Sequence, residues 1–482
     1  MCILLPLGVQ VVGGVGRRVG GGPEERYLSA VGWWYRLVVH YGISDESAVR
    51  ILRKNQAQGA RQVVLGGRRD ERRTKIARDP TASATPLSGG RAVLYWELPF
   101  GELTTKGESM KVPFYGHQRQ YQSIKDEIDA KMQEVLMSGQ YVQGPMLASF
   151  ERELAAYNGS KYAIGVGNGT DALWLTFMAL GLGEGDEVIT NANTFFATVE
   201  AIWIAGCTAV LVDCDRETRC IDPAAVRKAV TKRTRAIVPV HLYGQCAPMR
   251  ALRAIADEYG LLMVEDNAQS IDARGDDFKI GELSDAVCTS FIIQKNLGTF
   301  GDGGAIWTDH QFVNDQVRKL RNHGSNRRDV HSPGFNSRLD DLHAGVLSAK
   351  LKHIREWSDR RITIADKYTR ELAGCHFIDL PRARPGYRHV FHLYEIETRD
   401  AADRDKMLDY LVKSGIDAKT HYSIPIHGQE GFPWGRPSRL AGPLTNAEKN
   451  AASCISLPMF PELTEDEIDY TIQVVRDWPR NR

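Results

Sequence analysis

The residue best placed for covalent chemistry is Lys295, which lies in a Gly-rich segment between two apolar runs. The runs 286–291 and 305–308 have strand-like compositions, so we expect a loop between two strands to hold Lys295. Asp266 ends the apolar run 261–264, and an acid at the carboxyl end of a strand is well placed to meet a ligand. A lone lysine is more often a solvated surface group. Paired with an aspartate, it matches pyridoxal 5'-phosphate (PLP) chemistry, in which the lysine forms a Schiff base and the aspartate keeps the pyridine nitrogen protonated.

A second candidate site is the turn 165–171, Gly-Val-Gly-Asn-Gly-Thr-Asp, between a predicted strand and a predicted helix. Backbone N–H groups at a helix N-terminus favour a phosphate, and glycines let the anion approach closely. A simple turn with Thr170 or Asp171 as the helix cap fits the same residues. The turn is neither a dinucleotide-binding G-x-G-x-x-G nor a P-loop.

Further polar and aromatic residues follow other predicted strands. Phe195, in Asn-Thr-Phe-Phe-Ala-Thr, is placed to cover a flat cofactor, although aromatic residues are more often core. His241, Tyr243 and Gln269 belong to the same edge of the predicted sheet, and His241 alone reads as a hydrogen-bonded structural residue. No ligand spacing for a metal is present in the sequence.

The elements that position these residues alternate between strand and helix from residue 162 to residue 264. Such alternation predicts an α/β fold with a parallel sheet between helices and a ligand crevice at the strands' carboxyl ends. The predicted strands are 162–166, 187–190, 209–212, 236–242 and 261–264, and the predicted helices are 170–182, a second one ending at Ala205, 223–230 and 249–259.

A long helical stretch, about 342–372, is expected to lead the chain out of this sheet into a smaller α/β unit. There we expect a strand at 391–396, a helix at 402–413 and a last helix that begins at Thr464, with Glu467 completing a capping box. Before the sheet, apolar residues at helical spacing from Ile124 to Leu136 predict a helix that Gly139 ends. The predicted domains are therefore 110–350 and 351–482.

Whole-chain composition limits the possible partners. The 482 residues include 61 basic and 60 acidic groups, so nucleic acid is not an expected partner. No apolar run reaches membrane-spanning length, and the eight cysteines include no C-x-x-C pair, so reduced thiols and a cytoplasmic location are expected.

The first 109 residues differ from the rest of the chain. They carry 16 basic and 10 acidic residues and 16 glycines, with little patterned apolar sequence apart from a possible short helix from Trp33 through Ile51. We expect a poorly structured or non-native N-terminal extension, and a functional chain that begins near Met110.

Eight ordered motifs resemble those of the DegT/StrS family of PLP-dependent nucleotide-sugar aminotransferases. The resemblance covers about Met110 to Trp478 and implies an aspartate-aminotransferase-like fold, in which a homodimer shares its active sites. The motifs are Asn-Gly-Thr-Asp-Ala-Leu (168–173), Gly-Asp-Glu-Val-Ile (185–189), Asn-Thr-Phe (193–195), His-Leu-Tyr-Gly-Gln (241–245), Glu-Asp-Asn-Ala-Gln (265–269), Ser-Phe-x-x-x-Lys-Asn-Leu-Gly (290–298), Gly-Asp-Gly-Gly-Ala (301–305) and Asn-Ser-Arg-Leu-Asp (336–340).

The resemblance also implies roles for individual residues. Lys295 would be the Schiff-base lysine and proton shuttle, and Asp266 the partner of the pyridine nitrogen. The other matching positions are Phe195 for ring stacking, Gln269 for the ring hydroxyl, Gly169, Thr170 and Ser290 for the phosphate, Asn336 for a phosphate contact from the other subunit, and His421 for the substrate pocket.

This chain departs from the family pattern after the Asp-x-x-Gln motif. It has Asn267 where the family commonly has a small residue, and Ile271-Asp272 where the family commonly has His-Gly. We expect the departure to affect the shape of the pocket rather than the chemistry.

The implied activity is transfer of an amino group, with glutamate as the expected donor, to a keto nucleotide-sugar in amino-sugar or polysaccharide biosynthesis. Asn336-Ser337-Arg338-Leu339-Asp340 resembles the loop of members that act on 3-keto sugars, whereas members that act on carbon 4 more often have Asn-Tyr-Arg-Met. The resemblance implies that this loop reaches in beside the cofactor phosphate from the partner subunit, where a small Ser in place of Tyr would reshape the pocket. The alternatives are a 4-keto sugar aminotransferase, a PLP-dependent sugar dehydratase and a PLP-binding regulator without turnover. The family's dehydratase branch has histidine in place of the lysine, so Lys295 argues against a dehydratase.

Overall fold

The computed structural model describes residues 2–4, 10–12, 36–37, 82–87, 91–96, 110–327 and 329–478. The chain forms two compact units, Met1–Gly107 and Glu108–Arg482. In the first unit β1 (Cys2–Leu4), β2 (Gln10–Val12) and β3 (Arg36–Leu37) form an antiparallel sheet, and β4 (Ala82–Leu87) pairs with β5 (Arg91–Trp96). The short helix expected from Trp33 falls on β3 at residues 36–37, and its other residues lie outside the described ones.

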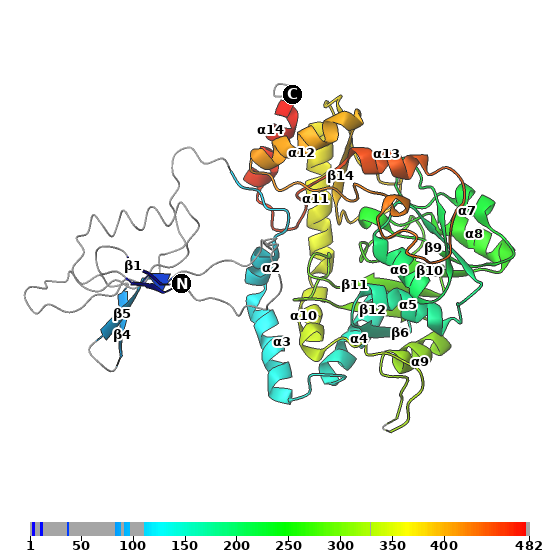
Figure 1. Ribbon diagram of the computed structural model, residues 1–482, viewed down its shortest axis with the longest axis horizontal. Helices are drawn as coiled ribbons and strands as arrows, with labels where there is room; N and C mark the ends of the chain where they lie inside the picture. The colour runs from blue at the N-terminus through cyan, green and yellow to red at the C-terminus, as the bar shows by residue number, and fades with distance from the viewer. Residues whose placement is uncertain are drawn as a thin grey trace, which may run out of the picture. The chain divides into compact units, whose positions relative to one another are not determined.

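The second unit is built on an eight-stranded sheet, of which Figure 1 labels β6, β9, β10, β11 and β12. The strand order is β15-β8-β7-β9-β10-β11-β12-β6. Only β12 runs antiparallel to its neighbours within this sheet, so the predicted α/β fold with a mostly parallel sheet is confirmed. The strands are β6 (Tyr162–Val166), β7 (Glu187–Asn191), β8 (Thr208–Val212), β9 (Thr234–Val238), β10 (Leu262–Asp266), β11 (Ala286–Ser290), β12 (Gly304–Thr308) and β15 (Ser438–Leu440).

Helices cover both faces of this sheet because successive strand residues point to opposite sides. Ile237 and Trp307 pack into the cluster on one face, whereas Val238 and Ile306 pack into the cluster on the other. The first face is covered by α4 (Pro145–Asn158), α7 (Pro223–Ala229), α8 (Met249–Tyr259) and α10 (Asp341–Leu351), and the second by α5 (Gly169–Ala179), α6 (Phe196–Ile204), α9 (Gln311–Leu320) and α13 (Thr445–Ser453).

The helices before the sheet are α2 (His117–Ser123) and α3 (Lys125–Ser138). Gly139 follows α3 in the left-handed conformation, with φ of 67°, as the predicted stop requires. Ile128 and Val135 of α3 are buried, whereas Leu136 and Met137 at its end are exposed.

The helical stretch predicted at about 342–372 consists of two helices, α10 and α11 (Ile354–Leu372). Near the break the N–H of His353 donates to the carbonyl of Lys350, three residues back, which tightens the end of α10. In the sequence no proline or glycine marks this break.

A smaller antiparallel sheet follows α11, with the order β13 (Ile378–Asp379), β14 (Tyr394–Thr398) and β16 (Cys454–Leu457). The strand predicted at 391–396 is displaced toward the C-terminus as β14, and the predicted helix at 402–413 is α12 (Arg404–Lys413). Before α14 (Glu465–Asp477) the hydroxyl of Thr464 accepts from the N–H of Glu467 at 3.2 Å, and Glu467 accepts from the N–H of Thr464 at 3.0 Å. The predicted capping box is therefore confirmed.

β15 returns from the C-terminal part of the chain to pair in parallel with β8 of the large sheet. Arg439 of this strand donates to the buried carboxylate of Glu187 at 2.9 Å and to the carbonyl of Ala229 at 2.8 Å. The C-terminal segment thus completes the large sheet as well as forming the smaller one.

In the described part of the chain no helix is long and apolar enough to cross a membrane. Seven of the cysteines lie there with side chains placed, and all seven are free thiols; only Cys375 among them is not fully buried.

Candidate active site

A cavity of about 630 Å³ opens where β10 and β11 end and where α5 and α6 begin. Residues 392, 421 and 422, from the part of the chain after α11, complete its wall. The cavity is lined by all but one of the residues to which the family resemblance gives a role, namely Gly169, Thr170, Phe195, Asp266, Gln269, Ser290, Lys295 and His421.

Asp266 is the last residue of β10 and is 6% exposed. Its carboxylate accepts from the Thr198 hydroxyl at 2.8 Å and from the Ala268 N–H at 3.1 Å. Burial raises the pKa of Asp266, while these two hydrogen bonds and the charge of Lys295 oppose the rise. Asp266 is therefore a fixed acceptor in the cavity wall.

Lys295 lies between β11 and β12 on a loop closed by backbone hydrogen bonds, including Phe291 N–H to Gly303 and Thr299 N–H to Phe291. Within residues 110–327 and 329–478, its Nζ has no hydrogen bond or ion pair. Burial lowers the pKa of Lys295 to about 8, and the charge of Asp266 only partly opposes this. A free amine with a lowered pKa is suited to nucleophilic attack and to proton transfer.

The start of α5 forms a cradle with Ser290 at the end of β11. Asn168 caps α5 by accepting from the N–H of Asp171 at 2.8 Å, so the N–H groups of Gly169 and Thr170 are left for an acceptor outside the helix. A Cβ at Gly169 would lie 2.6 Å from the Cβ of Ser290. Only glycine fits there, and the geometry suits a phosphate.

Phe195 and Gln269 supply the remaining predicted cofactor contacts. Phe195 is 56% exposed although it lines the cavity, and its ring centroid lies 5.8 Å from that of Tyr422. The side chain of Gln269 accepts from the Tyr243 N–H at 2.7 Å and donates to the Tyr422 hydroxyl at 3.0 Å. The second hydrogen of its amide remains for another acceptor.

His421 is held by hydrogen bonds to residues behind the cavity wall. Its Nδ1 lies 2.9 Å from the Ser456 hydroxyl, and its carbonyl accepts from the hydroxyl of Tyr243. Burial, with the charges of Lys295 and Lys419, lowers the pKa of His421 to about 4. The imidazole is therefore neutral near pH 7.

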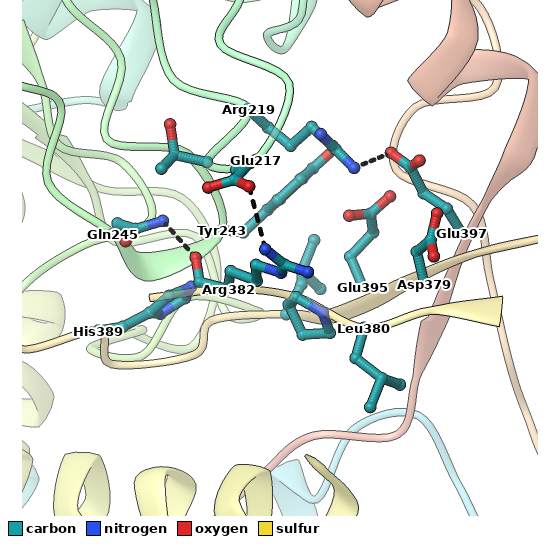
Figure 2. A pocket seen from close by; sticks show the side chains of 13 residues that line it. Glu217, Arg219, Tyr243, Gln245, Asp379, Leu380, Arg382, His389, Glu395 and Glu397 are labelled. Carbon is teal, nitrogen blue, oxygen red and sulfur yellow. Dashed lines mark hydrogen bonds and ion pairs between the residues drawn. The ribbon is translucent and has the colours of Figure 1, made fainter. Parts of the chain in front are cut away.

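Tyr243 also borders a cluster of charged residues, where residues 217–245 meet residues 379–397 of the second unit (Figure 2). The Tyr243 hydroxyl lies 3.2 Å from Oδ1 of Asn450, whose Nδ2 donates to Glu395 at 2.7 Å and to Glu397 at 2.8 Å. Arg219 forms an ion pair with Glu397, as Figure 2 shows. Burial and the charge of Glu397 raise the pKa of Glu395 above its usual range.

Asn336, the remaining residue to which the family resemblance gives a role, does not line the cavity of its own chain. It is exposed and forms an isolated bridge with Asn322. The neighbouring Ser337 is buried; its hydroxyl donates to Asp171 at 2.6 Å and accepts from the Gly167 N–H at 3.0 Å. Within its own chain Ser337 therefore supports the α5 turn; the expectation that it shapes the pocket concerns the partner subunit and stays a prediction.

The residues that depart from the family pattern also lie outside the cavity. Asp272 binds Arg388 at 2.7 Å and accepts from the Tyr157 hydroxyl at 2.7 Å. Asn267 faces a separate cavity together with Asp272. His241 is structural, since its Nδ1 accepts from the Ala247 N–H at 3.0 Å and its Nε2 lies 2.5 Å from Glu265.

Sequence reasoning missed several residues that line the cavity or lie directly behind its wall. Thr198, which holds Asp266, stands inside a motif that we read only for its aromatic ring. His392 and Tyr422 line the cavity from the C-terminal part of the chain, and Tyr115 lines it from the segment before α2. A single polar or aromatic residue far along the chain carries no local sign of such a role.

The residues present fit PLP. The unpartnered Lys295 amine, the buried Asp266 carboxylate, the exposed Phe195 ring and the cradle of Gly169 and Ser290 share one cavity. No group of three metal-ligating side chains that could hold a metal ion occurs among the described residues. Fold and site together define the class of PLP-dependent enzymes in which the cofactor lies at the strand ends of a mostly parallel sheet.

Comparison with known proteins gives the family. The model of the DegT/DnrJ/EryC1/StrS aminotransferase family matches residues 122–476. The dTDP-3-amino-3,4,6-trideoxy-alpha-D-glucose transaminase of Streptomyces venezuelae is 41% identical over 377 residues, which are 78% of this chain and 98% of that protein. A protein of Geobacillus stearothermophilus named pleiotropic regulatory protein is 42% identical over 375 residues, 77% of this chain and 100% of that one.

The X-ray crystal structure of DesV from S. venezuelae has the same fold, with a TM-score of 0.73 at 41% identity over 76% of this chain and 98% of that one. The chain belongs to the DegT/DnrJ/EryC1/StrS family of PLP-dependent aminotransferases. The predictions of family, fold class, enzyme class and cofactor are confirmed.

Proposed function

We propose that this aminotransferase moves the amino group of an amino acid, with glutamate as the expected donor, onto a keto carbon of a nucleotide-linked sugar. Its place is in amino-sugar or polysaccharide biosynthesis. The observation that carries the proposal is the Lys295 amine, which is free of partners in the described chain and shares one cavity with the buried Asp266 carboxylate. The name of the S. venezuelae relative, a nucleotide-sugar transaminase, supports the substrate class.

Each residue has a separate task in this proposal. Bound PLP supplies the electron sink for the carbon that loses or gains the amino group. Lys295 attaches the cofactor and moves a proton at its Nζ, which the lowered pKa allows near neutral pH. Asp266 holds a negative charge against the pyridine nitrogen, and the Thr198 hydroxyl holds Asp266 in place.

The other cavity residues bind and orient. The free N–H groups of Gly169 and Thr170, with the Ser290 hydroxyl, would hold the cofactor's phosphate. Phe195 would stack on its ring, and the free amide hydrogen of Gln269 would reach the ring hydroxyl. His421, neutral near pH 7, would contact the sugar as a hydrogen-bonding group rather than as a cation.

We propose carbon 3 as the site of amination. The support is the Asn-Ser-Arg-Leu-Asp loop at 336–340 and the 3-amino sugar in the name of the S. venezuelae relative. Because Ser337 bonds to Asp171 in its own chain, any effect of this residue on the sugar must pass through the α5 turn or act across a subunit interface. Amination at carbon 4 is the alternative.

We further propose a cytoplasmic homodimer in which Asn336 reaches the partner's cofactor phosphate. Asn336 is exposed and outside its own cavity, as such a role requires. Leu136, Met137, Tyr141 and Val142 are exposed apolar side chains near the end of α3, a surface that a second copy could cover. The seven free thiols support a reducing compartment.

A second candidate is a PLP-binding regulator without turnover, because one relative is named a pleiotropic regulatory protein. The free Lys295 amine favours the enzyme, since a binding role alone does not need a base in the cavity. Lys295 also argues against a sugar dehydratase, because the family's dehydratase branch has histidine at this position.

The test is a screen of the purified protein with glutamate against 3-keto and 4-keto nucleotide sugars, with mass spectrometry to locate the new amine. We expect amination at carbon 3. Lys295→Ala should lower turnover by at least about a thousandfold and remove the visible absorbance of the attached cofactor, whereas Lys232→Met, on an exposed loop, should change neither.

The outcomes separate the candidates. Exclusive amination at carbon 4 rejects the position and keeps the enzyme class. Normal turnover by Lys295→Ala rejects the assignment of the lysine. Cofactor binding without amination of any keto sugar favours the regulator.

A further inference from the structure

A second cavity, of about 320 Å³, lies on the other side of the loop that follows β10. Asp266, Ala268 and Gln269 line the active-site cavity, whereas Asn267, between them in sequence, lines this one. Its remaining walls come from the end of α4, the segment 272–280 and the start of α11. The cavity is therefore adjacent to the active site and separate from it.

Asn267 is a buried polar side chain without a partner. It is 1% exposed, and neither Oδ1 nor Nδ2 has a hydrogen-bond partner among the described residues. Buried amides are nearly always hydrogen-bonded in native proteins, so an unpaired one at a cavity wall points to a missing partner. The amide can both donate to a ligand and accept from one.

Two cationic side chains at the same cavity are also unpaired. Arg274 and Lys279 are exposed, and neither forms an ion pair within the described part of the chain. Arg355, whose side chain is 50% exposed, lines the cavity with them and lies 3.5 Å from Asp272. The unpaired positive charges of Arg274 and Lys279 at one cavity favour an anion.

The cavity's carboxylate does not cancel this charge. Asp272 accepts from Arg388 at 2.7 and 3.1 Å and from the Tyr157 hydroxyl at 2.7 Å. Burial and Asp272 raise the pKa of Tyr157, so its hydroxyl keeps its proton and donates to that carboxylate. Asp272 is thus paired with Arg388, which also pairs with Asp359 at 2.7 Å, and with Arg355 at 3.5 Å, so the charge left free at the cavity is that of Arg274 and Lys279.

We propose that this cavity binds a small phosphate ester of a polyhydroxylated molecule, such as a sugar phosphate. Arg274, Lys279 and Arg355 would hold the phosphate, and the amides of Asn158 and Asn267 would bind hydroxyl groups. The volume lies near the lower end of those of small-molecule sites, about 300–1,000 Å³. Most of the lining residues are polar or charged, which suits a polyhydroxylated ligand.

The test is isothermal titration calorimetry of the full-length holoenzyme, whose own phosphate cradle is filled, with glucose 1-phosphate, inorganic phosphate and glucose. We expect saturable binding of glucose 1-phosphate, weaker binding of inorganic phosphate and none of glucose. The double variant Arg274→Met/Lys279→Met should weaken binding by about tenfold or more. The control Lys228→Met/Lys232→Met removes the same charge from exposed lysines of another surface and should bind as the parent does.

Asn267→Leu separates binding from structure. It removes both hydrogen-bonding atoms at similar volume, so it should weaken binding of glucose 1-phosphate while the melting temperature stays the same or rises. Equal binding by parent and Arg274→Met/Lys279→Met overturns the site, as does equal loss in the control. Equal affinity for inorganic phosphate overturns the sugar ester as the ligand.

Discussion

At the scale of single residues, the chemistry rests on an amine that the protein leaves free. Lys295 has a carboxylate in the same cavity, yet no side chain in the described chain bonds to its Nζ. Burial without a partner stabilises the neutral amine. An ion pair in the same place would keep the lysine protonated and unreactive.

The lowered pKa of Lys295 predicts that the reactivity of its amine changes with pH close to neutrality. Its pKa is lowered from 10.5 to about 8, and only the neutral amine attacks an electrophile. In cofactor-free protein, labelling of Lys295 by an acylating reagent should rise with pH and reach half its maximum near pH 8. Mass spectrometry of the peptide that contains Lys295 gives the rate, and a midpoint near 10.5 would contradict the prediction.

Glu395 predicts a pH dependence of stability. Its pKa is raised above 4.5 in the folded protein, so above pH 4.5 the folded state keeps a proton that the unfolded state loses. Stability from this group is present below pH 4.5 and is lost as pH rises through the raised pKa of the folded protein. Glu395→Gln removes the dependence, so its melting temperature relative to the parent should rise from pH 5.5 to pH 8. An equal difference at both pH values would show that Glu395 does not titrate in this window.

At the scale of elements, the capping box of α14 gives a quantitative prediction. Thr464→Ala leaves the N–H of Glu467 without its acceptor, and loss of such a cap costs about 1 kcal/mol of stability. Chemical denaturation measures the change. Thr363→Ala, at an exposed position inside α11, is the matched control and should cost less, since alanine is the better helix former. A loss at Thr363 as large as that at Thr464 would argue against the cap.

Elements with a strong local pattern were predictable from sequence, and elements that depend on distant contacts were not. The strands β6 to β11 stand out because their apolar residues are buried on both faces. β15 is Ser-Arg-Leu, too short and too polar to be recognised, and it exists because it pairs with β8. The same distinction holds for the residues of the site. Lys295 and Asp266 were predictable because they belong to local motifs, whereas His392 and Tyr422 were not, because only the tertiary fold brings them to the cavity.

At the scale of the whole molecule, the N-terminal 109 residues can be tested directly. The relatives from S. venezuelae and G. stearothermophilus match 377 and 375 residues of this chain, and those matches span 98% and 100% of the relatives' own lengths. We therefore predict that a chain beginning at Met110 folds and keeps its transaminase activity. Circular dichroism and the amination assay check this, and loss of either would show that residues 1–109 are needed.

The pairing of β15 with β8 also has a consequence for synthesis on the ribosome. The residues that complete the large sheet, 438–440, are made after more than 400 others, so the edge of β8 stays open through most of translation. An open strand edge can pair with a strand of another molecule. A nascent chain of this protein is therefore exposed to aggregation until its C-terminal segment emerges. A message truncated before codon 438 would yield an aggregation-prone fragment rather than an independent domain.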